Sequence, residues 1–217
     1  MVLRHRNIEG AQVIDGELVV VEMGLQGGDE LNLIEPGANY GWPLVSYGRR
    51  YERFGGAPIG TGMAKMDGTV QPLYFWDPVI APNDFIIYEG DMFPEWQGDM
   101  LITALVAGGL VRLSFGEDGL VDEEERVLPD LKRTRDVEIG DDGALLVVTD
   151  QEDGGVRQGS CRLHSFSRCV LGWAGHGAAA ASFMGERVGS PMASAPGIGS
   201  LGVKPDRADG LPVAGLT

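Results

Sequence analysis

The sequence predicts an all-β protein, because short apolar runs alternate with turn signals throughout residues 1–158. No segment of this body repeats apolar residues every 3.6 positions over several turns, so few helices are expected. Asp-Gly dipeptides, which favour tight hairpin turns, separate several of the runs. Many short strands joined by glycine turns indicate a sandwich, a barrel or a propeller.

Each predicted strand is an apolar or alternating run bounded by glycine, proline or a charged turn. In chain order the strands cover residues 11–14, 17–22, 30–34, 70–75, 85–88, 99–105, 110–115, 126–128, 134–139 and 144–149. A long glycine- and proline-containing loop, residues 55–72, interrupts the series, and loops of this length in compact domains are often functional.

Internal similarity favours the propeller. Residues 6–22 and 135–150 both begin with arginine beside Asn or Asp, pass through Asp-Gly, and end in an apolar run. Residues 98–113 resemble the two middle strands of another such unit. Repeated four-stranded units of about 40–50 residues are typical of propeller blades, so we expect a partial β-propeller. Its arginines would converge on one rim of the central channel; the alternative is that they pair with the abundant carboxylates.

Residues 22–43 are the most informative stretch of the chain. A buried strand leads into a glycine-rich turn, then into Asp29 and Glu30, a half-buried strand, and the loop Asn39-Tyr40-Gly41-Trp42-Pro43. As a general pattern this is two strands and a loop. Asp29 and Glu30 also look, by themselves, like a pair of metal ligands.

The charge of the chain excludes some classes of partner. The formal net charge is −15, divided as −17 in residues 1–159 and +2 in residues 160–217. An acidic body repels nucleic acid and anionic lipid, so neither is expected as a partner. No run of about 18 apolar residues predicts a membrane span, and the first residues lack the apolar core of a signal peptide. The cysteines fall after residue 160, so the body has neither a disulfide framework nor a thiolate metal site.

The composition changes abruptly near residue 159. Residues 159–217 are rich in Gly, Ala, Ser and Pro and show no strand alternation, which predicts a low-order tail. One hypothesis is that this tail is translated out of frame or fused. Cys161, His164, Cys169 and His176 lie in it, but their spacing fits no zinc pattern.

Four landmarks in this order resemble the soluble pyrroloquinoline-quinone (PQQ)-dependent sugar dehydrogenases, the glucose/sorbosone dehydrogenase family, in its aldose dehydrogenase branch. The landmarks are residues 5–7, residues 27–34 running to 39–43, residues 80–82, and residues 133–136 leading to 142–145. The resemblance covers residues 4–155. It implies a six-bladed β-propeller, of which this chain would hold about three blades, the C-terminal half.

The resemblance also implies the cofactor site. Arg6 and Asn7 match a pair that contacts PQQ, and Arg133 and Arg135 match a later pair that clamps it. Guanidinium groups suit the three carboxylates of PQQ, and a cation near the quinone would stabilise charge that develops on reduction.

The implied metal is calcium, held by the backbone carbonyls of Gly24 and Leu25. The family usually has proline at the second position, so leucine leaves that carbonyl direction less constrained. This places the metal contact before Asp29 and Glu30, which keep a supporting role. Tyr74 and Trp76 match a substrate-side loop and are weaker candidates for sugar contacts.

No catalytic residue is expected in this chain. The base of the family is a histidine in the N-terminal half, whereas His5 belongs to the cofactor motif and His164 and His176 to the tail. The complete enzyme would oxidise the C1 hydroxyl of an aldose to the lactone. This chain is then a fragment, inactive alone. The alternatives are a non-catalytic propeller-like binding module or pseudoenzyme, and a calcium-dependent lactonase.

The expected partners are an aldose and an electron acceptor in the complete enzyme. The isolated chain would expose unpaired blade faces and would pair with the missing N-terminal half or associate with itself. By resemblance, the family is periplasmic or secreted.

Overall fold

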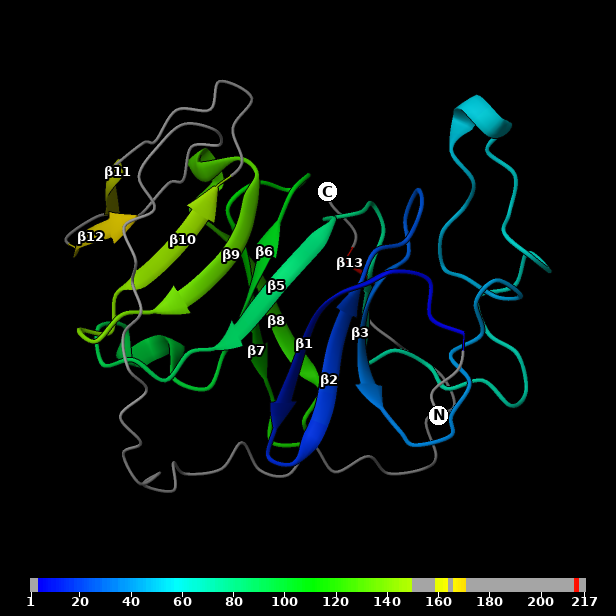
Figure 1. The fold of residues 1–217 in the computed structure, drawn as a ribbon, viewed down its shortest axis with the longest axis horizontal. Helices are drawn as coiled ribbons and strands as arrows, with labels where there is room; N and C mark the ends of the chain where they lie inside the picture. Colours follow the sequence, from blue (N-terminus) through cyan, green and yellow to red (C-terminus); the bar gives the residue numbers. More distant parts are fainter. Residues whose placement is uncertain (1–3, 150–158, 164–165, 171–212, 215–217) are drawn as a thin grey trace, which may run out of the picture.

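The computed structural model describes residues 4–149, 159–163, 166–170 and 213–214 (Figure 1). Regular structure in these residues is β-strand, apart from three short 3-10 helices: η1 (Glu52–Phe54), η2 (Pro94–Trp96) and η3 (Pro129–Leu131). The predicted low helix content is therefore confirmed. No helix among the described residues is long and apolar enough to cross a membrane.

The first sheet contains the N-terminal strands in chain order. These are β1 (Ile8–Ile14), β2 (Glu17–Glu22), β3 (Asp29–Ile34) and β4 (Tyr74–Trp76), each antiparallel to the next. A short C-terminal strand, β13 (Val213–Ala214), pairs in parallel with β4. Because β1 to β4 follow one another as a meander, they form the kind of four-stranded sheet expected of a blade.

The second sheet repeats this order. It contains β5 (Pro82–Ile87), β6 (Met100–Ala104), β7 (Leu110–Phe115) and β8 (Val121–Val127), again antiparallel throughout. A third unit begins with the hairpin β9 (Thr134–Ile139) and β10 (Leu145–Thr149). A separate hairpin joins β11 (Gly159–Leu163) and β12 (Phe166–Val170).

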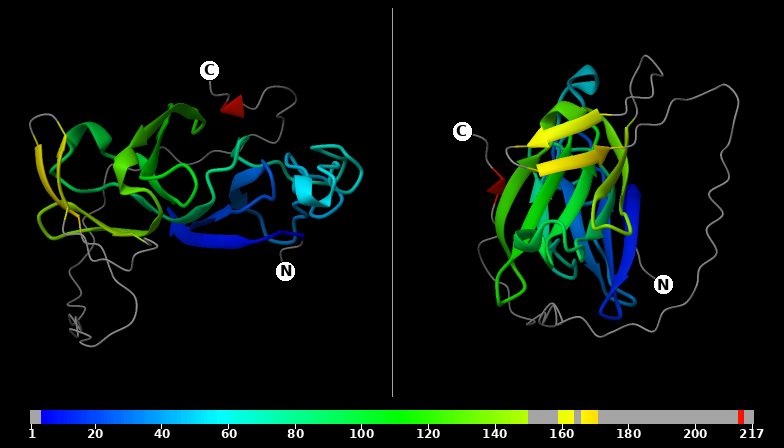
Figure 2. Two further views of the ribbon diagram at one scale, coloured as in Figure 1. Left: turned by 90° about the horizontal axis from the view of Figure 1, so that it is seen from above. Right: turned by 90° about the vertical axis from the view of Figure 1, so that its left-hand side faces the viewer.

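The sheets are arranged side by side, with the first strand of each unit next to the first strand of the following unit. β5 contacts both β1 and β9 (Figures 1 and 2). The chain therefore forms a partial β-propeller of two four-stranded blades and the first hairpin of a third, as the internal similarity predicted. That similarity compared the β1–β2 hairpin with the β9–β10 hairpin, which hold equivalent places in their units.

Two hydrophobic cores hold the units together. Val19, Leu31 and Trp76 of the first blade pack in one cluster with Phe85 and Ile102 of the second. Each of these side chains is fully buried. Since burying one large apolar side chain stabilises a fold by about 1.5–3 kcal/mol, this interface contributes strongly to stability.

The second core joins the second blade to the β9–β10 hairpin. Tyr88, Phe93 and Leu110 pack in one cluster with Val137 and Leu145. Buried residues of β9 and β10, among them Val137, Leu145 and Val147, supply the face that closes this core.

Two strands differ from their predicted extents for identifiable reasons. β4 begins at Tyr74 and not near residue 70, and Pro72, which lacks an N–H donor, lies in the excluded part. β8 begins at Val121 and not at residue 126. The prediction missed its first residues because they are mostly charged and face solvent at the outside of the blade. An apolar criterion misses an outer strand of this kind. The predicted low-order tail, residues 159–217, lies largely outside the described residues.

Candidate functional site

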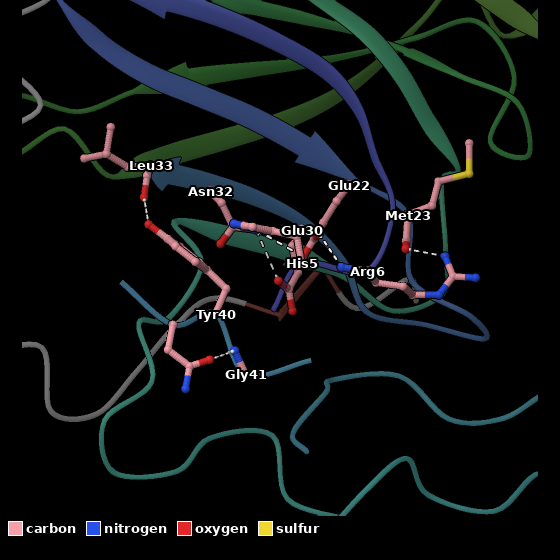
Figure 3. Close-up of polar contacts among 10 residues, drawn as sticks. His5, Arg6, Glu22, Met23, Glu30, Asn32, Leu33, Tyr40 and Gly41 are labelled. Atoms are coloured by element: carbon pink, nitrogen blue, oxygen red, sulfur yellow. Dashed lines mark hydrogen bonds and ion pairs between the residues drawn. The ribbon is translucent and has the colours of Figure 1, made fainter. Parts of the chain in front are cut away.

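The loop after β2 is held by residues that precede β1. Met23 donates its N–H to the carbonyl of Asn7 at 2.9 Å, and Arg6 Nη1 donates to the carbonyl of Met23 at 2.6 Å (Figure 3). The side chain of Asn7 donates instead to Glu9 Oε1 at 2.6 Å. Two predicted cofactor residues, Arg6 and Asn7, therefore lie directly beside the loop that carries the predicted metal ligands.

Close backbone packing explains the glycines of this loop. A Cβ atom on Gly24 would lie 2.2 Å from the carbonyl oxygen of Gly27. Gly28 has a φ of +74°, and a Cβ there would lie 2.5 Å from the amide nitrogen of Gly48. Since neither position has room for a side chain, the glycines specify a compact, ordered loop.

Asp29 joins this loop to the start of the second blade. Its side chain accepts backbone N–H bonds from Gly24, Ile80 and Ala81, each at 2.7 Å, and the residue is 1% exposed. Burial raises the pKa of the Asp29 carboxyl, and the three amide donors oppose that rise. The supporting role predicted for Asp29 is thus a structural one: it orders the loop.

A buried polar cluster lies beside the loop, on β2 and β3 (Figure 3). Glu22 Oε2 lies 3.2 Å from His5 Nδ1 and accepts the N–H of Arg6 at 3.1 Å, while Asn32 Nδ2 lies 3.2 Å from Glu30 Oε2. Burial opposes ionisation of Glu22, yet hydrogen bonds from His5 and Glu30 lower its pKa overall. Burial and the neighbouring Glu22 raise the pKa of Glu30 well above its ordinary value. Of the two carboxyl groups, Glu22 therefore has the lower pKa and Glu30 the higher.

The cluster lines a small cavity. Its walls come from the residues before β1, the β2–β3 loop and the segment after β3: Arg6, Glu22, Met23, Gly24, Gly28, Glu30, Tyr40, Trp42, Val45 and Ser46. Tyr40 stacks on His5 with 4.2 Å between ring centroids, and the guanidinium carbon of Arg6 lies 5.7 Å from the centroid of the Trp42 ring. The lining of the cavity thus combines the cation of Arg6 with the carboxyl groups of Glu22 and Glu30.

The second pair of predicted cofactor residues lies at β9. Arg133 precedes this strand and Arg135 lies within it, both half-buried. The carbonyl of Arg135 accepts a bond from Asn83 Nδ2 at 3.2 Å, so its backbone is held against β5. β5 lies between β1 and β9 in the row of inner strands (Figure 1). The Arg6–Asn7 pair and the Arg133–Arg135 pair therefore stand on either side of one strand, β5.

The predicted metal ligands occupy the compact part of the loop. Gly24 lines the cavity, and Leu25 forms an isolated β-bridge with Gly27. No group of three or more His, Cys, Asp or Glu side chains within the described residues could hold a metal ion. The donors on offer at the cavity are instead carbonyl and carboxyl oxygens, the atom type that a hard cation such as calcium prefers.

The weaker substrate candidates do not face the cavity. Tyr74 and Trp76 are 4% and 0% exposed in the core between the two blades. Tyr74 Oη and Trp76 Nε1 both donate to Glu124 Oε2 at 3.0 Å. Buried rings of this kind have no free face for a sugar, so their placement supports packing and argues against substrate contact.

No catalytic base was expected, and His5, the one histidine of residues 4–149, is not among the residues that line the cavity. Its Nδ1 is paired with Glu22 and its Nε2 is buried without a partner among the described residues. His164 and His176 lie outside the described part of the chain. Sequence reasoning did not identify Glu22 and Asn32 as polar members of the site. Their position on otherwise apolar strands could have identified them, because a polar group buried in such a strand requires hydrogen-bond partners.

Comparison with known proteins identifies the family. The model of the family "Glucose / Sorbosone dehydrogenase" matches residues 3–158, which include every described element from β1 to β10. The chain belongs to the glucose/sorbosone dehydrogenase family. The resemblance drawn from the landmark residues is thereby confirmed.

Relatives of known structure share the fold. A crystal structure of a glucose dehydrogenase matches with a TM-score of 0.63 and 38% identity, covering 68% of this chain and 43% of that one. The PQQ-bound aldose sugar dehydrogenase of Streptomyces coelicolor matches with a TM-score of 0.51 and 27% identity, covering 77% and 42%. The family is one of sugar dehydrogenases, and it includes a member with PQQ bound.

Among relatives in sequence, the aldose sugar dehydrogenase YliI of Escherichia coli (strain K12) is 40% identical over 134 residues, 61% of this chain and 35% of its own. The uncharacterised protein slr1608 of Synechocystis is 40% identical over 152 residues, 69% and 36%. The chain thus spans little more than a third of the length of these relatives.

Proposed function

We propose that this chain supplies part of the cofactor site of a PQQ- and calcium-dependent aldose dehydrogenase, of which it is a fragment. The observation that carries the proposal is the junction of Arg6 with the Met23–Gly24 loop, which places a fixed cation beside backbone and carboxyl oxygens. A dianionic or trianionic cofactor needs a cation to bind it, and a hard metal ion needs oxygen ligands.

The donor set of the chain fits both groups. Arg6 and Asn7, which precede β1, and Arg133 and Arg135, at the start of β9, would bind the cofactor carboxylates. The carbonyls of Gly24 and Leu25 would hold calcium; Gly24 lines the cavity that Glu22 and Glu30 also line. When bound, PQQ supplies the electron-accepting quinone for oxidation of the sugar C1 hydroxyl to the lactone.

The residues of this chain bind and orient, and they do not move the substrate proton. Arg6 is held by its bond to Met23 and by the ring of Trp42, so its guanidinium is preorganised and little side-chain entropy is lost on binding. Asp29 keeps the loop closed through its three backbone bonds. The base would be the histidine that the family resemblance places in the N-terminal half, since a base must lie within reach of the substrate proton.

The proposal is tested by equilibrium binding of PQQ to the purified chain in the presence of calcium. We expect Arg6→Ala to weaken binding by about tenfold to hundredfold, because a charge-assisted bidentate contact contributes roughly 1.5–3 kcal/mol. Arg126→Ala is the matched control: Arg126 lies on the outer strand β8, paired with Glu124, so its loss leaves binding unchanged.

Turnover is measured on the same samples with aldose and a dye acceptor. The proposal predicts binding without appreciable oxidation. Clear oxidation by the isolated chain would show that it contains a base and would contradict fragment status. Absence of PQQ binding at any calcium concentration would instead favour the non-catalytic binding module.

A further inference from the structure

Residues 44–65, which we call the basic loop, carry a positive charge in an otherwise acidic body. They hold one carboxylate, Glu52, and four cations: Arg49, Arg50, Arg53 and Lys65. Their net charge is +3, and since residues 1–159 total −17, the rest of this body totals −20. All four cations are exposed, and none of them forms an ion pair within residues 4–149. The loop therefore presents positive charge to solvent that no ion pair neutralises.

Large apolar side chains are exposed beside these cations. Phe54 is 64% exposed and Met63 is 48% exposed. The guanidinium carbon of Arg53 lies 4.8 Å from the centroid of the Phe54 ring and 5.4 Å from that of Tyr51. Arginine, aromatic residues and methionine are enriched in protein–protein interfaces, and arginine and tyrosine are frequent among the residues that contribute most to binding. The composition of the basic loop is therefore that of a surface that contacts another protein.

The basic loop is anchored beside the proposed calcium ligands. Arg49 and Gln26 exchange backbone N–H bonds of 2.9 and 3.1 Å, and Gln26 directly follows Leu25. The ring of Tyr47 stacks on that of Phe75, on β4, with 3.9 Å between the centroids. Beyond these contacts the loop extends past β3, away from the second blade (Figures 1 and 2). An anchored surface of this kind loses less conformational entropy on association than a free segment does.

We propose that the basic loop is the docking surface for a protein that presents an acidic patch. Opposite charges on the two surfaces steer their association. An extended polyanion fits less well, because it would also run along the acidic blades, whereas a compact partner meets the loop alone. The exposed apolar side chains of Phe54 and Met63 also match the mixed apolar and polar surface of a protein. That this partner is an electron-accepting protein rests on the proposed function; the docking itself does not.

The test uses the whole chain and two small redox proteins of opposite charge as probes, an acidic flavodoxin and a basic cytochrome c. A carbodiimide joins a carboxylate of the probe to a lysine amine that lies in contact with it. We expect flavodoxin to be joined to Lys65 and not to Lys132, which is exposed at the end of η3. Cytochrome c should be joined to carboxylates outside residues 44–65. Equal coupling of flavodoxin to Lys65 and Lys132 would overturn the proposal.

Substitutions separate the contributions of charge and apolar contact. Arg53→Gln should weaken flavodoxin binding by about threefold to fivefold at low salt and reduce its dependence on salt, because one interfacial charge is lost. Phe54→Ser should weaken binding by a similar factor and leave the salt dependence unchanged. Lys132→Gln is the matched control, since it removes one exposed cation elsewhere and should leave the affinity unchanged.

Two results would contradict the proposal. One is equal affinity of flavodoxin for the native chain and for Arg53→Gln. The other is tighter binding of a hyaluronate oligosaccharide than of flavodoxin at the basic loop, which would assign the loop to acidic sugars. Failure of PQQ to bind would count against the proposed function and would leave the cross-linking and affinity results decisive for the docking surface.

Discussion

Replacement of Asp29 by asparagine should destabilise the chain more than any other single-atom change near the site. Oδ2 of Asp29 accepts the N–H groups of Ile80 and Ala81, and Oδ1 accepts that of Gly24. An asparagine has one acceptor oxygen, so its best orientation keeps the first two bonds and turns an NH2 donor toward the third N–H.

The magnitude follows from these three bonds. Leaving one buried N–H without an acceptor costs about 1–3 kcal/mol, and loss of charge assistance weakens each remaining bond by roughly 1 kcal/mol. Together these changes lower the free energy of unfolding by about 3–5 kcal/mol. For a chain of this size that corresponds to a fall in Tm of roughly 10 °C.

Urea unfolding monitored by tryptophan fluorescence measures this change at neutral pH. Asp118→Asn is the matched control, because its carboxylate accepts a single N–H in an exposed turn, and we expect a change below about 0.5 kcal/mol. If Asp29→Asn lowered the free energy of unfolding by less than about 1 kcal/mol, this would refute the reasoning that the hydrogen bonds of Asp29 hold the loop to the second blade.

Three further changes test other parts of the account. Gly24→Ala places a Cβ 2.2 Å from a carbonyl oxygen and should abolish PQQ binding, whereas Gly37→Ala meets open space at a φ of +87° and should cost only about 1 kcal/mol of stability in thermal unfolding. Glu124→Ala leaves two buried ring donors without their acceptor and should lower the free energy of unfolding by about 2–4 kcal/mol in urea; a change under 1 kcal/mol would contradict this. Because the pKa of Asp84 is raised, its contribution to stability is present below about pH 4 and lost as the pH rises through 6. Asp84→Asn should therefore gain about 1–2 kcal/mol over the native chain at pH 8, after allowance for partial exposure, and nothing at pH 4; an equal difference at both pH values would be inconsistent.

The architecture was predictable because its repeating signals are local. The apolar runs and the Asp-Gly turns of β1–β2 and β9–β10 specify hairpins without reference to distant residues. Outer strands carry less of this signal: β8 is mostly charged, and β4 is three residues long. Their pairing depends on contacts made elsewhere in the blade.

The site was predictable in part. Arg6 and Gly24 could be placed from the order of the landmark residues, and the structure brings the two segments together through the bond of Arg6 to Met23. The backbone contacts of Asp29 with the second blade could not be predicted, since they join residues about 50 positions apart. Nothing in the local pattern around Asp29 distinguishes it from a solvent-exposed aspartate.

The burial of Tyr74 and Trp76 is a further feature that the local sequence pattern could not predict. An aromatic cluster after a long loop is compatible with a sugar platform or with a core. The donors of both rings converge on Glu124, almost 50 residues later, and this long-range contact decides for the core.

The central claim is that this chain supplies part of a calcium-dependent PQQ site. Titration of the chain with PQQ, first with calcium and then with excess EDTA, tests this claim most directly. We predict saturable binding with calcium and at least a tenfold weaker affinity after chelation, because chelation would remove the ion that the carbonyls of Gly24 and Leu25 are proposed to hold. Equal affinity under both conditions would contradict the account.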